Sequence, residues 1–381
     1  MFTIRIHTPS GRYPVFLGRG LLKNTGPLLA GQLPAGPVLV VSDKNVAPLY
    51  ARQCLQSLQA AGYKPYLEVL AGGEQVKTLE TAAGLYTRAL QAGLDRRAAI
   101  VALGGGVIGD LAGFVAATYL RGVPYVQVPT TLLAMVDSSV GGKVAVNHPL
   151  GKNLIGSFYQ PTLVISDMAT LKTLPAREFN AGLAELIKYA LIWDRKFFKD
   201  LENLQQKNIP AGNGLLSAVQ PRLLKYIRRA VRIKGEIVSR DERENDLRRI
   251  LNFGHTFAHA LEAATDYAYY LHGEAVACGM LMAVRLAVLL RILDRAAARR
   301  ISTLLRRLLK FPPPPPALKP QAVAKALFYD KKKEGAALVF ILPQAAGRVL
   351  VCKAPPLNFV QQVIDEYLYK MGTAAGQPEG M

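Results

Sequence analysis

Short apolar runs and longer stretches with helical period alternate along the first 170 residues of the chain. Five runs have the length of buried strands: residues 37–43, 64–70, 98–106, 123–131 and 163–168. Helix-period stretches separate the first four runs. Strands that alternate with helices of this length are typical of βαβ units. We therefore predict a Rossmann-like α/β domain with a mostly parallel sheet.

The pattern changes near residue 175, where strand-like runs stop and helical periodicity continues to about residue 310. Residues 311–316 contain five consecutive prolines, which end any helix and favour an extended connector. A hairpin pattern at 337–351 and a final helix follow. We predict an NAD-binding α/β domain at 1–174, a mainly α-helical metal- and substrate-binding domain at 175–370, and a disordered tail at 371–381.

Composition is typical of a globular protein of the cytoplasm. Half of the 381 residues are hydrophobic, so each of two domains can bury a core. No apolar run of about 18 residues lacks a charge, and the N-terminus has no apolar signal core, so we expect no membrane span. Cys54, Cys278 and Cys352 are odd in number and far apart. This argues against a disulfide framework and favours a reducing, cytoplasmic environment.

The net charge of +20 raises the alternative of a nucleic-acid partner. Much of the excess lies in helix-period stretches at 222–234 and 291–310, where arginines recur beside leucines. This arrangement is typical of the solvated face of a packed helix. Neither an aromatic stacking platform nor a nucleic-acid motif accompanies it. We therefore expect no nucleic-acid partner, and a secondary effect of the charge in attracting acidic substrates.

A glycine pattern of the form G-x-G-x-x-G follows one predicted strand directly. Gly104, Gly106 and Gly109 open an apolar helix there. Glycines let the backbone approach a pyrophosphate, and the helix N-terminus offers unpaired N–H groups to its charge. Asp43, at the end of an earlier strand, is a candidate partner for a ribose. The alternative, a tight strand–helix turn without a ligand, stays open at this point.

A second glycine-rich segment, residues 128–161, carries Asp137, Lys143, Lys152 and Asn153. Lysines in a loop lined by small residues suit a phosphate or a carboxylate, because the small residues leave room for the anion. A surface loop with solvated lysines is the weaker alternative, since apolar sequence flanks the segment on both sides.

Three of the five histidines lie between residues 251 and 280. Two of them, His255 and His259, are four residues apart in a helix-period run and project from one helix face. Such a pair is a common way to hold a divalent metal, although a pair of buried core histidines has the same spacing.

Another candidate ligand lies in the apolar helical stretch 181–192, where Glu185 and Lys188 are three residues apart. A surface ion pair has this spacing. Burying the pair costs several kcal/mol unless a ligand or a metal compensates. Glu185 would complete a His/His/carboxylate zinc set with an open position.

Taken in order, the motifs resemble the 3-dehydroquinate synthase family over about residues 10–370. They are GGEQVK (72–77), GGGVIGD (104–110), TYLRGVPYVQVPTTLLAMVDSSVGGK (118–143), GKNLIGSFYQP (151–161), LKTLP (171–175), GLAELIKY (182–189), LRRILNFGHT (247–256), LHGEAVACGM (271–280) and DKK (330–332). A set of this size is far more specific than any single motif.

The resemblance implies a homodimeric, NAD-dependent, zinc-containing lyase of the shikimate pathway, which leads to the aromatic amino acids. Its substrate would be 3-deoxy-D-arabino-heptulosonate 7-phosphate. Transient oxidation by NAD, phosphate elimination, re-reduction and aldol cyclisation would give 3-dehydroquinate. Two alternatives share the fold: a related cyclase acting on sedoheptulose 7-phosphate or glucose 6-phosphate, and a metal-dependent polyol dehydrogenase resembling glycerol dehydrogenase.

The resemblance also assigns residues. It implies Glu185, His255 and His272 as ligands of zinc, with cobalt as an alternative metal, and so replaces His259 in the pair that spacing favours. The catalytic group implied is His259, Lys188, Glu244, Arg248 and Asn252. Substrate positions are Asp137, Lys143, Asn153, Lys188, Lys234, Arg248, Asn252, His259, Arg121, contributed across a dimer interface, and Lys332 or its neighbour Lys331. NAD positions are Asp43, Asn45, Glu74, Lys77, Gly105, Gly106, Val107, Asp110, Thr130, Thr131, Lys143, Lys152, Thr170, Leu171, Lys172 and Thr173.

Overall fold

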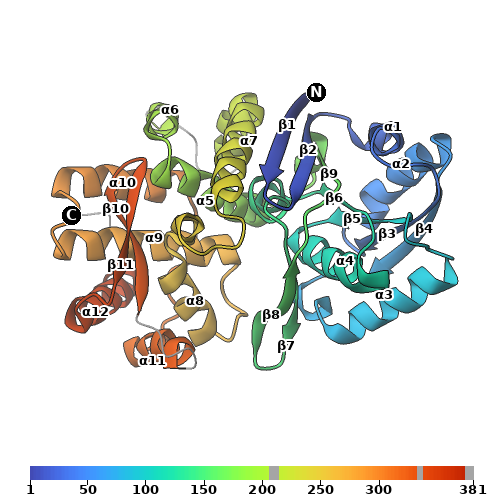
Figure 1. Ribbon diagram of the computed structural model, residues 1–381. Coiled ribbons are helices and arrows are strands. Elements are labelled where there is room, and N and C mark those ends of the chain that lie inside the picture. Colours follow the sequence, from blue (N-terminus) through green and yellow to red (C-terminus); the bar gives the residue numbers. More distant parts are fainter. Residues whose placement is uncertain (206–213, 333–337, 374–381) are drawn as a thin grey trace. The chain divides into compact units, whose positions relative to one another are not determined.

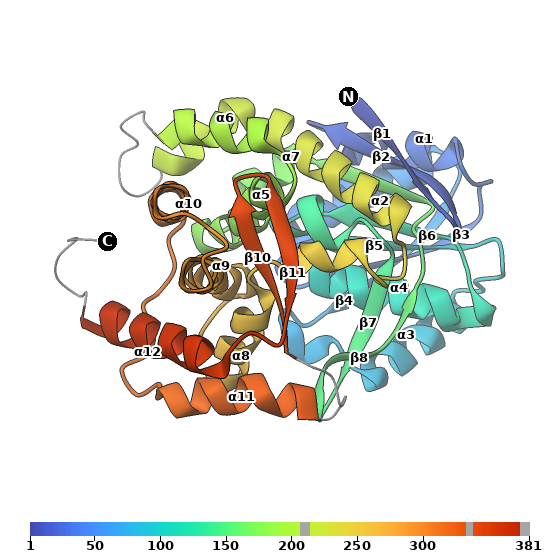
Figure 2. The ribbon, with the colours of Figure 1, turned by 60° about the vertical axis from the view of Figure 1, so that its left-hand side comes forward.

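The computed structural model describes residues 1–205, 214–332 and 338–373, which form two compact units (Figure 1, Figure 2). The first unit contains residues 1–175 and 222–243. The second contains the described parts of 176–221 and 244–381. Helix α12 (Leu357–Thr373) continues past residue 370, and the rest of the tail that we predicted to be disordered lies outside the described residues.

A seven-stranded sheet forms the centre of the first unit, in the order β1-β2-β9-β6-β5-β3-β4. Its edge strand β1 is antiparallel to β2, and all other neighbours are parallel. The mostly parallel sheet predicted from the sequence is therefore confirmed. The strands are β1 (Phe2–Thr8), β2 (Gly11–Gly18), β3 (Pro37–Asp43), β4 (Lys64–Leu70), β5 (Ala99–Gly104), β6 (Tyr125–Pro129) and β9 (Leu163–Asp167).

Helices cover both faces of this sheet. Val38 and Val40 of β3 pack on the side of α1 (Thr25–Ala30) and α2 (Ala47–Ala60), whereas the alternate residues Leu39 and Val41 pack on the side of α3 (Leu79–Gln91) and α4 (Gly106–Thr118). Successive strand residues point to opposite faces, so a strand buried on both faces is apolar throughout. This is why β3 is a continuous apolar run.

Shorter elements complete the first unit. A separate antiparallel hairpin is formed by β7 and β8. Single turns lie at the strand ends, including a π-helical turn, η4. Their bounds are β7 (Lys143–His148), β8 (Gly151–Phe158), η1 (Leu22–Asn24), η2 (Glu74–Val76), η3 (Tyr119–Arg121), η4 (Ala134–Ser138) and η5 (Met168–Lys172).

Residues 222–240 of α7 (Gly214–Arg240) also belong to the first unit. Gly235 lies so close to β1 that a Cβ atom there would be 2.4 Å from Cδ1 of Ile6. The guanidinium of Arg228 lies 4.6 Å from the ring centre of Phe2. From the sequence we placed residues 222–243 in the helical domain, because helical periodicity does not show which core a helix packs against.

The second unit is mainly helical, as predicted. Its elements are α5 (Ala176–Ile192), α6 (Arg195–Gln205), η6 (Leu247–Asn252), α8 (His255–Ala264), α9 (His272–Leu289), α10 (Arg295–Leu308), α11 (Pro320–Lys332), β10 (Val339–Ala345), β11 (Arg348–Lys353) and α12. Within the described residues, only α9 is long and apolar enough to cross a membrane, and 78% of it is buried inside the protein. Its apolar side chains are therefore accounted for by packing in the core.

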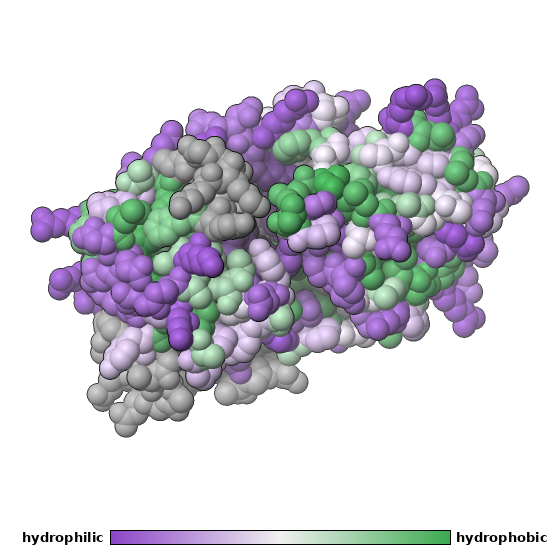
Figure 3. Space-filling model, turned by 90° about the horizontal axis from the view of Figure 1, so that it is seen from below, coloured by the Kyte–Doolittle hydropathy of each residue, from purple (hydrophilic) through white to green (hydrophobic). Residues whose placement is uncertain are grey.

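The arginine-rich stretch near residue 300 is the solvated face of a packed helix, as its spacing indicated. In α10, Ile301, Leu304 and Leu308 are buried, while Arg299 and Arg306 are exposed. On the face of the molecule seen in Figure 3, hydrophilic side chains likewise surround smaller groups of apolar ones.

The carboxylate of Glu242, just after α7, joins three segments of the first unit. It accepts hydrogen bonds from the backbone N–H of Ser10 at 3.1 Å, from the Ser10 hydroxyl, and from Nε2 of Gln160 at 2.7 Å. Burial raises the pKa of Glu242, but these hydrogen bonds outweigh burial and the net pKa is lowered. The ionised form therefore stabilises the fold.

Replacing Glu242 by Gln is expected to lower the free energy of unfolding by about 1–3 kcal/mol at neutral pH, because the Ser10 and Gln160 donors lose a charged acceptor. Because the pKa of Glu242 is lower in the folded protein, its contribution to stability is fully present above pH 4.5, the ordinary pKa. The contribution is lost as the pH falls through the lower pKa of the folded protein. Denaturant unfolding of both proteins at neutral and acidic pH measures it. A difference that persists unchanged in acid would contradict the assignment.

Candidate active site

Three side chains from three helices of the second unit converge on a point suited to a metal. Glu185 comes from the middle of α5, His255 is the first residue of α8, and His272 is the first residue of α9. Their ligand atoms all lie within 4.8 Å of one another. Nε2 of His255 and Nε2 of His272 lie 3.5 Å and 3.7 Å from Oε1 of Glu185. Ligand atoms placed tetrahedrally around a zinc ion are about 3.4 Å apart, so the three groups fit such an ion.

The surroundings of Glu185 favour a cation at this point. Its side chain is fully buried, and Oε2 forms an ion pair with Nζ of Lys188, which is itself 2% exposed. Oε1, which faces both histidines, accepts no hydrogen bond from the part of the chain that the structure describes. A buried carboxylate oxygen without a donor is costly, and a bound divalent cation would compensate it.

The two histidines are held by their other ring nitrogens. Nδ1 of His255 lies 3.2 Å from the carbonyl oxygen of Phe253, which can only accept, so Nε2 keeps its lone pair. Burial and the neighbouring charge of Lys188 place the pKa of His255 well below its ordinary value, so the ring is neutral and able to bind a metal. Burial also lowers the pKa of His272, but the hydrogen bond to Glu262 and the charges of Glu262 and Glu185 outweigh it, and the pKa is raised.

Glycines allow the three helices to approach closely enough for this convergence. A Cβ atom on Gly273 would lie 2.0 Å from the carbonyl oxygen of Ala181 in α5. A Cβ atom on Gly279 would lie 2.1 Å from the carbonyl oxygen of Gly254, which precedes His255 and has φ +83°. Side chains at Gly273 and Gly279 would therefore push α9 away from α5 and from the start of α8.

The pair that spacing favoured, His255 and His259, does not occur together in either group of metal-binding atoms found among the described residues. Their rings lie edge to face, with centres 5.6 Å apart. His259 instead belongs to a second group with Glu262 and His272. Helical spacing places both rings on one side of α8 but cannot show that α9 brings a third histidine to the same place.

The glycine turn of the first unit has the features of a site for a pyrophosphate. Gly106 opens the 13-residue helix α4. Cβ atoms on Gly105 and Gly106 would lie 3.2 Å from Thr131 Cγ2 and 3.1 Å from Ser138 Oγ, so side chains here would narrow the turn. The Oγ atoms of Ser138 and Thr130 are buried and, among the described residues, have no hydrogen-bond partner. Unpaired hydroxyls near a helix N-terminus fit the phosphates of NAD.

A network of polar side chains joins the hairpin β7–β8 to the segment before α3. Nζ of Lys77 donates to Oδ2 of Asp110 and to Oδ1 of Asn153, both at 2.5 Å. Nδ2 of Asn147 donates to Oε1 of Glu74 at 2.8 Å, and the N–H of Asn153 donates to Oδ1 of Asn147 at 2.9 Å. Four of these five residues are predicted site residues. Asn147 was missed, and its place in a short turn-forming stretch was the only signal for it.

Other predicted residues of the first unit lie at the carboxyl ends of the parallel strands, where nucleotides bind in folds of this kind. Oδ1 of Asp43 accepts from the N–H groups of Asn45 and Val46 at 2.8 and 3.1 Å and so fixes the turn that leads into α2. Tyr50 donates to the carbonyl oxygen of Thr170 at 3.1 Å and contacts the hydroxyl of Thr173. Of the remaining residues of this group, Val107 lies in the first turn of α4, and Leu171 and Lys172 lie in η5.

The matches to known families cover most of the chain. The profile described as "3-dehydroquinate synthase N-terminal" matches residues 67–181, and the one described as "3-dehydroquinate synthase C-terminal" matches residues 182–333. A curated 3-dehydroquinate synthase of Pelotomaculum thermopropionicum is 49% identical over 365 residues, which cover 96% of each chain. The chain belongs to the 3-dehydroquinate synthase family.

Solved structures of sugar-phosphate cyclases have the same fold. A 2-deoxy-scyllo-inosose synthase in complex with carbaglucose-6-phosphate, NAD+ and Co2+ has a TM-score of 0.83 at 27% identity, covering 96% of this chain and 100% of that chain. The 2-epi-5-epi-valiolone synthase of Streptomyces hygroscopicus subsp. jinggangensis, solved with NAD+ and Zn2+, has a TM-score of 0.80 at 31% identity. It covers 95% of this chain and 97% of that chain.

Other predicted site residues lie in each of the two units. In the first, Nζ of Lys234 donates to Oδ1 and to the carbonyl oxygen of Asp137 at 2.6 and 2.8 Å. In the second, Nδ2 of Asn252 donates to Oε1 of Glu244 at 2.6 Å, and Arg248 is 2% exposed. The hydrogen bonds fix the direction of the Lys234 and Asn252 side chains.

For five predicted or alternative cationic site residues, the structure gives the exposure or the backbone conformation at most. Lys143 and Arg121 are exposed, and Lys152 is half-buried in β8. Arg121 follows Leu120 in a turn where both have positive φ, at 67° and 50°. The side chains of Lys331 and Lys332 lie outside the described residues.

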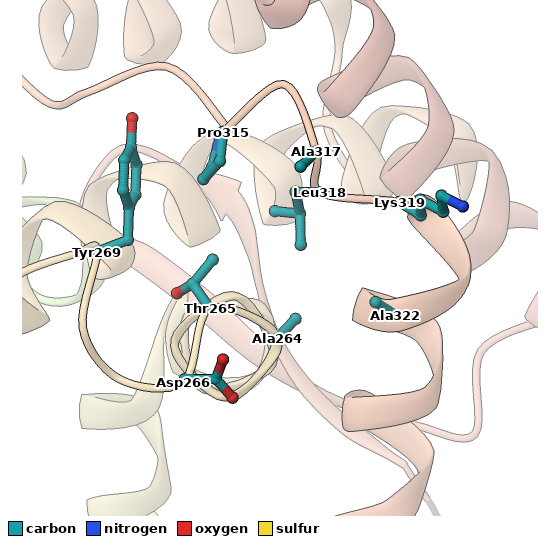
Figure 4. A pocket seen from close by; sticks show the side chains of 9 residues that line it. All are labelled: Ala264, Thr265, Asp266, Tyr269, Pro315, Ala317, Leu318, Lys319 and Ala322. Atoms are coloured by element: carbon teal, nitrogen blue, oxygen red, sulfur yellow. The ribbon is translucent and has the colours of Figure 1, made fainter.

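An open cavity of about 390 Å³ lies elsewhere in the second unit (Figure 4). It is lined by residues at the end of α8 and around the proline connector, among them Asp266, Tyr269, Pro315 and Leu318. His255 is at the opposite end of α8, so this cavity is separate from the metal group. None of the predicted site residues with described side chains lines it.

Replacing Gly279 by Ala is expected to destabilise the protein by roughly 1–3 kcal/mol and to weaken zinc binding, because the added methyl must displace the start of α8 and with it His255. Thermal unfolding and chelator competition measure the two effects. Gly84→Ala in α3 is the matched control, since a Cβ there meets nothing within 4 Å. If the two variants had the same thermal stability and the same zinc affinity, the close approach of α9 to Gly254 at Gly279 would not be needed for the metal group.

Proposed function

We propose that the chain is a 3-dehydroquinate synthase, a carbon–oxygen lyase that converts 3-deoxy-D-arabino-heptulosonate 7-phosphate to 3-dehydroquinate and phosphate. The reaction belongs to the shikimate pathway of aromatic amino acid biosynthesis. Family membership over nearly the whole chain supports this proposal. The observation that carries it is the convergence of Glu185, His255 and His272 around an unsatisfied buried carboxylate oxygen.

NAD and a divalent metal, zinc or cobalt, are the proposed cofactors. The related cyclases solved with NAD+ and Co2+ or Zn2+ support the pair. Glu185, His255 and His272 would hold the metal, and the turn at Gly105 and Gly106 would hold the pyrophosphate. When bound, NAD accepts and returns a hydride, and the metal stabilises the negative charge that develops on a substrate oxygen.

The chain's own cations would bind the two anionic ends of the substrate. Lys143, Lys188, Lys234 and Arg248 would supply positive charge for its carboxylate and its phosphate. Asp137 and Glu244 orient two partners, Lys234 and Asn252, through the hydrogen bonds described above. His259 would handle the proton that is lost as phosphate leaves.

The alternatives differ in what they require of these residues. A cyclase acting on sedoheptulose 7-phosphate has no substrate carboxylate to bind. A polyol dehydrogenase needs neither a carboxylate nor a phosphate site. The presence of Lys234, Arg248, Asn252 and His259 therefore favours the dehydroquinate reaction. The 49% identity to a curated 3-dehydroquinate synthase, against 27% and 31% to the two cyclases of other specificity, supports the same choice.

We also propose that the enzyme works in the cytoplasm as a homodimer in which Arg121 serves the site of the partner subunit. Its exposed position in a tight turn supports this role. A molar mass of one chain, measured by sedimentation at working concentrations, would contradict the dimer.

Offering the purified protein three substrates in parallel tests the proposed specificity. With NAD and zinc present, phosphate release and a carbocyclic product are expected from 3-deoxy-D-arabino-heptulosonate 7-phosphate only. Sedoheptulose 7-phosphate and glucose 6-phosphate should give rates at least about 100-fold lower, because the cations meant for a carboxylate stay unpaired. A faster reaction with either sugar would move the assignment to another cyclase.

A further inference from the structure

Glu262, a buried carboxylate outside the proposed metal set, lies beside one of its histidines. It follows His255 by seven residues and His259 by three in α8, so the three share one helix face. Its side chain is 7% exposed, and its Oε1 lies 3.4 Å from Nδ1 of His272. Nε2 of the same ring faces Oε1 of Glu185 at 3.7 Å. Each ring nitrogen of His272 therefore has a carboxylate of its own.

The other histidine of the set shows what such a contact does. The carbonyl oxygen of Phe253 fixes the proton of His255 on Nδ1 and leaves Nε2 directed at Glu185. A carboxylate in the corresponding place fixes the same tautomer. It also makes the imidazole a stronger ligand, because its negative charge stabilises positive charge on the ring. His272 needs such a contact more than His255 does, because its side chain is 35% exposed against 12%.

We propose that Glu262 is a positioning residue for His272, which it holds with Nε2 toward the metal and Nδ1 protonated. This inference rests on the proposed metal set of Glu185, His255 and His272. It assigns a role to a buried charge that the proposed reaction does not use. The sequence signal for it is a glutamate seven residues after His255, on the helix face that already carries two histidines.

One competing arrangement uses the same atoms. His259, Glu262 and His272 also lie within 4.8 Å of one another and form a second set of potential ligands. In that arrangement Glu262 would bind a metal itself, and Nδ1 of His272 would have to be deprotonated to join it. The two arrangements predict different effects of removing the charge of Glu262.

The experiment uses the full chain, stripped of metal, and measures its Kd for Zn2+ and Co2+ by competition with a chromophoric chelator. Glu262→Gln keeps the shape and removes the charge, and it is expected to weaken both metals 10- to 100-fold by order of magnitude. The visible absorption of bound Co2+ should keep its shape, because the ligands are unchanged. Glu262→Asp restores the charge and should recover part of the affinity.

Two reference variants set the scale. Glu185→Gln removes a proposed ligand and should weaken binding further than Glu262→Gln while altering the Co2+ spectrum. Glu366→Gln is the matched control: this carboxylate of the same unit pairs with Arg285 at 2.7 and 2.8 Å and belongs to neither group of potential metal ligands found among the described residues. Its metal affinity should stay within about twofold of the original protein. Far-ultraviolet circular dichroism of each metal-free variant confirms that it is folded.

A Glu262→Gln variant that binds both metals within about twofold of the original protein would overturn the proposal. A loss as deep as that of Glu185→Gln with an altered Co2+ spectrum would also overturn it, because Glu262 would then be a ligand. If Glu262→Gln fails to fold, Glu262→Asp becomes the test. A Glu262→Asp variant with the metal affinity of the original protein would contradict the proposal, because the shorter side chain should weaken the contact with His272. Metal binding is measured without substrate, so an inactive protein that binds zinc would refute the proposed function and leave this inference standing.

Discussion

The second unit depends on how it accommodates one buried carboxylate. Glu185 lies on a helix whose other residues around it are almost all apolar and buried. A charge in such a place costs several kcal/mol unless it is paired and coordinated. Lys188 pairs one oxygen, and an imidazole nitrogen from each of His255 and His272 approaches the other without donating a hydrogen bond to it within the described residues. A divalent cation supplies what is missing, so stability and metal binding depend on the same atoms.

Backbone packing determines whether this arrangement can form. The three helices that carry the ligands meet where Gly273 faces Ala181 and where Gly279 faces Gly254. These contacts leave no room for a methyl group. The positions of the imidazoles therefore follow from main-chain contacts, which are stiffer than side-chain rotamers, and Phe253 and Glu262 then fix the direction of each ring. The first unit uses its glycines differently, since Gly105 and Gly106 keep side chains away from the turn before α4 and leave space for a ligand.

Much of this could be predicted from the sequence. Alternation of apolar runs and helical stretches predicts the parallel sheet, and the cost of burying Glu185 among apolar residues predicts that it has a partner. Spacing alone pairs His255 with His259, whereas the group of potential ligands that contains His255 takes its second histidine from another helix. Periodicity also could not tell that residues 222–243 pack on β1. Asn147 and Glu262 were missed because their local signals, a turn-forming stretch and a glutamate on a helix face with two histidines, do not show which side chains the fold brings next to them.

In the proposed reaction NAD takes part and is regenerated in every turnover, while phosphate is released. The test is to follow phosphate release and NADH absorbance together. The assay contains an amount of NAD stoichiometric with the protein and a large excess of 3-deoxy-D-arabino-heptulosonate 7-phosphate. We expect many phosphates to be released per NAD without accumulation of NADH, and no release once a chelator has removed the metal. NADH formed in step with substrate consumption, without phosphate, would contradict the account and indicate a simple dehydrogenase.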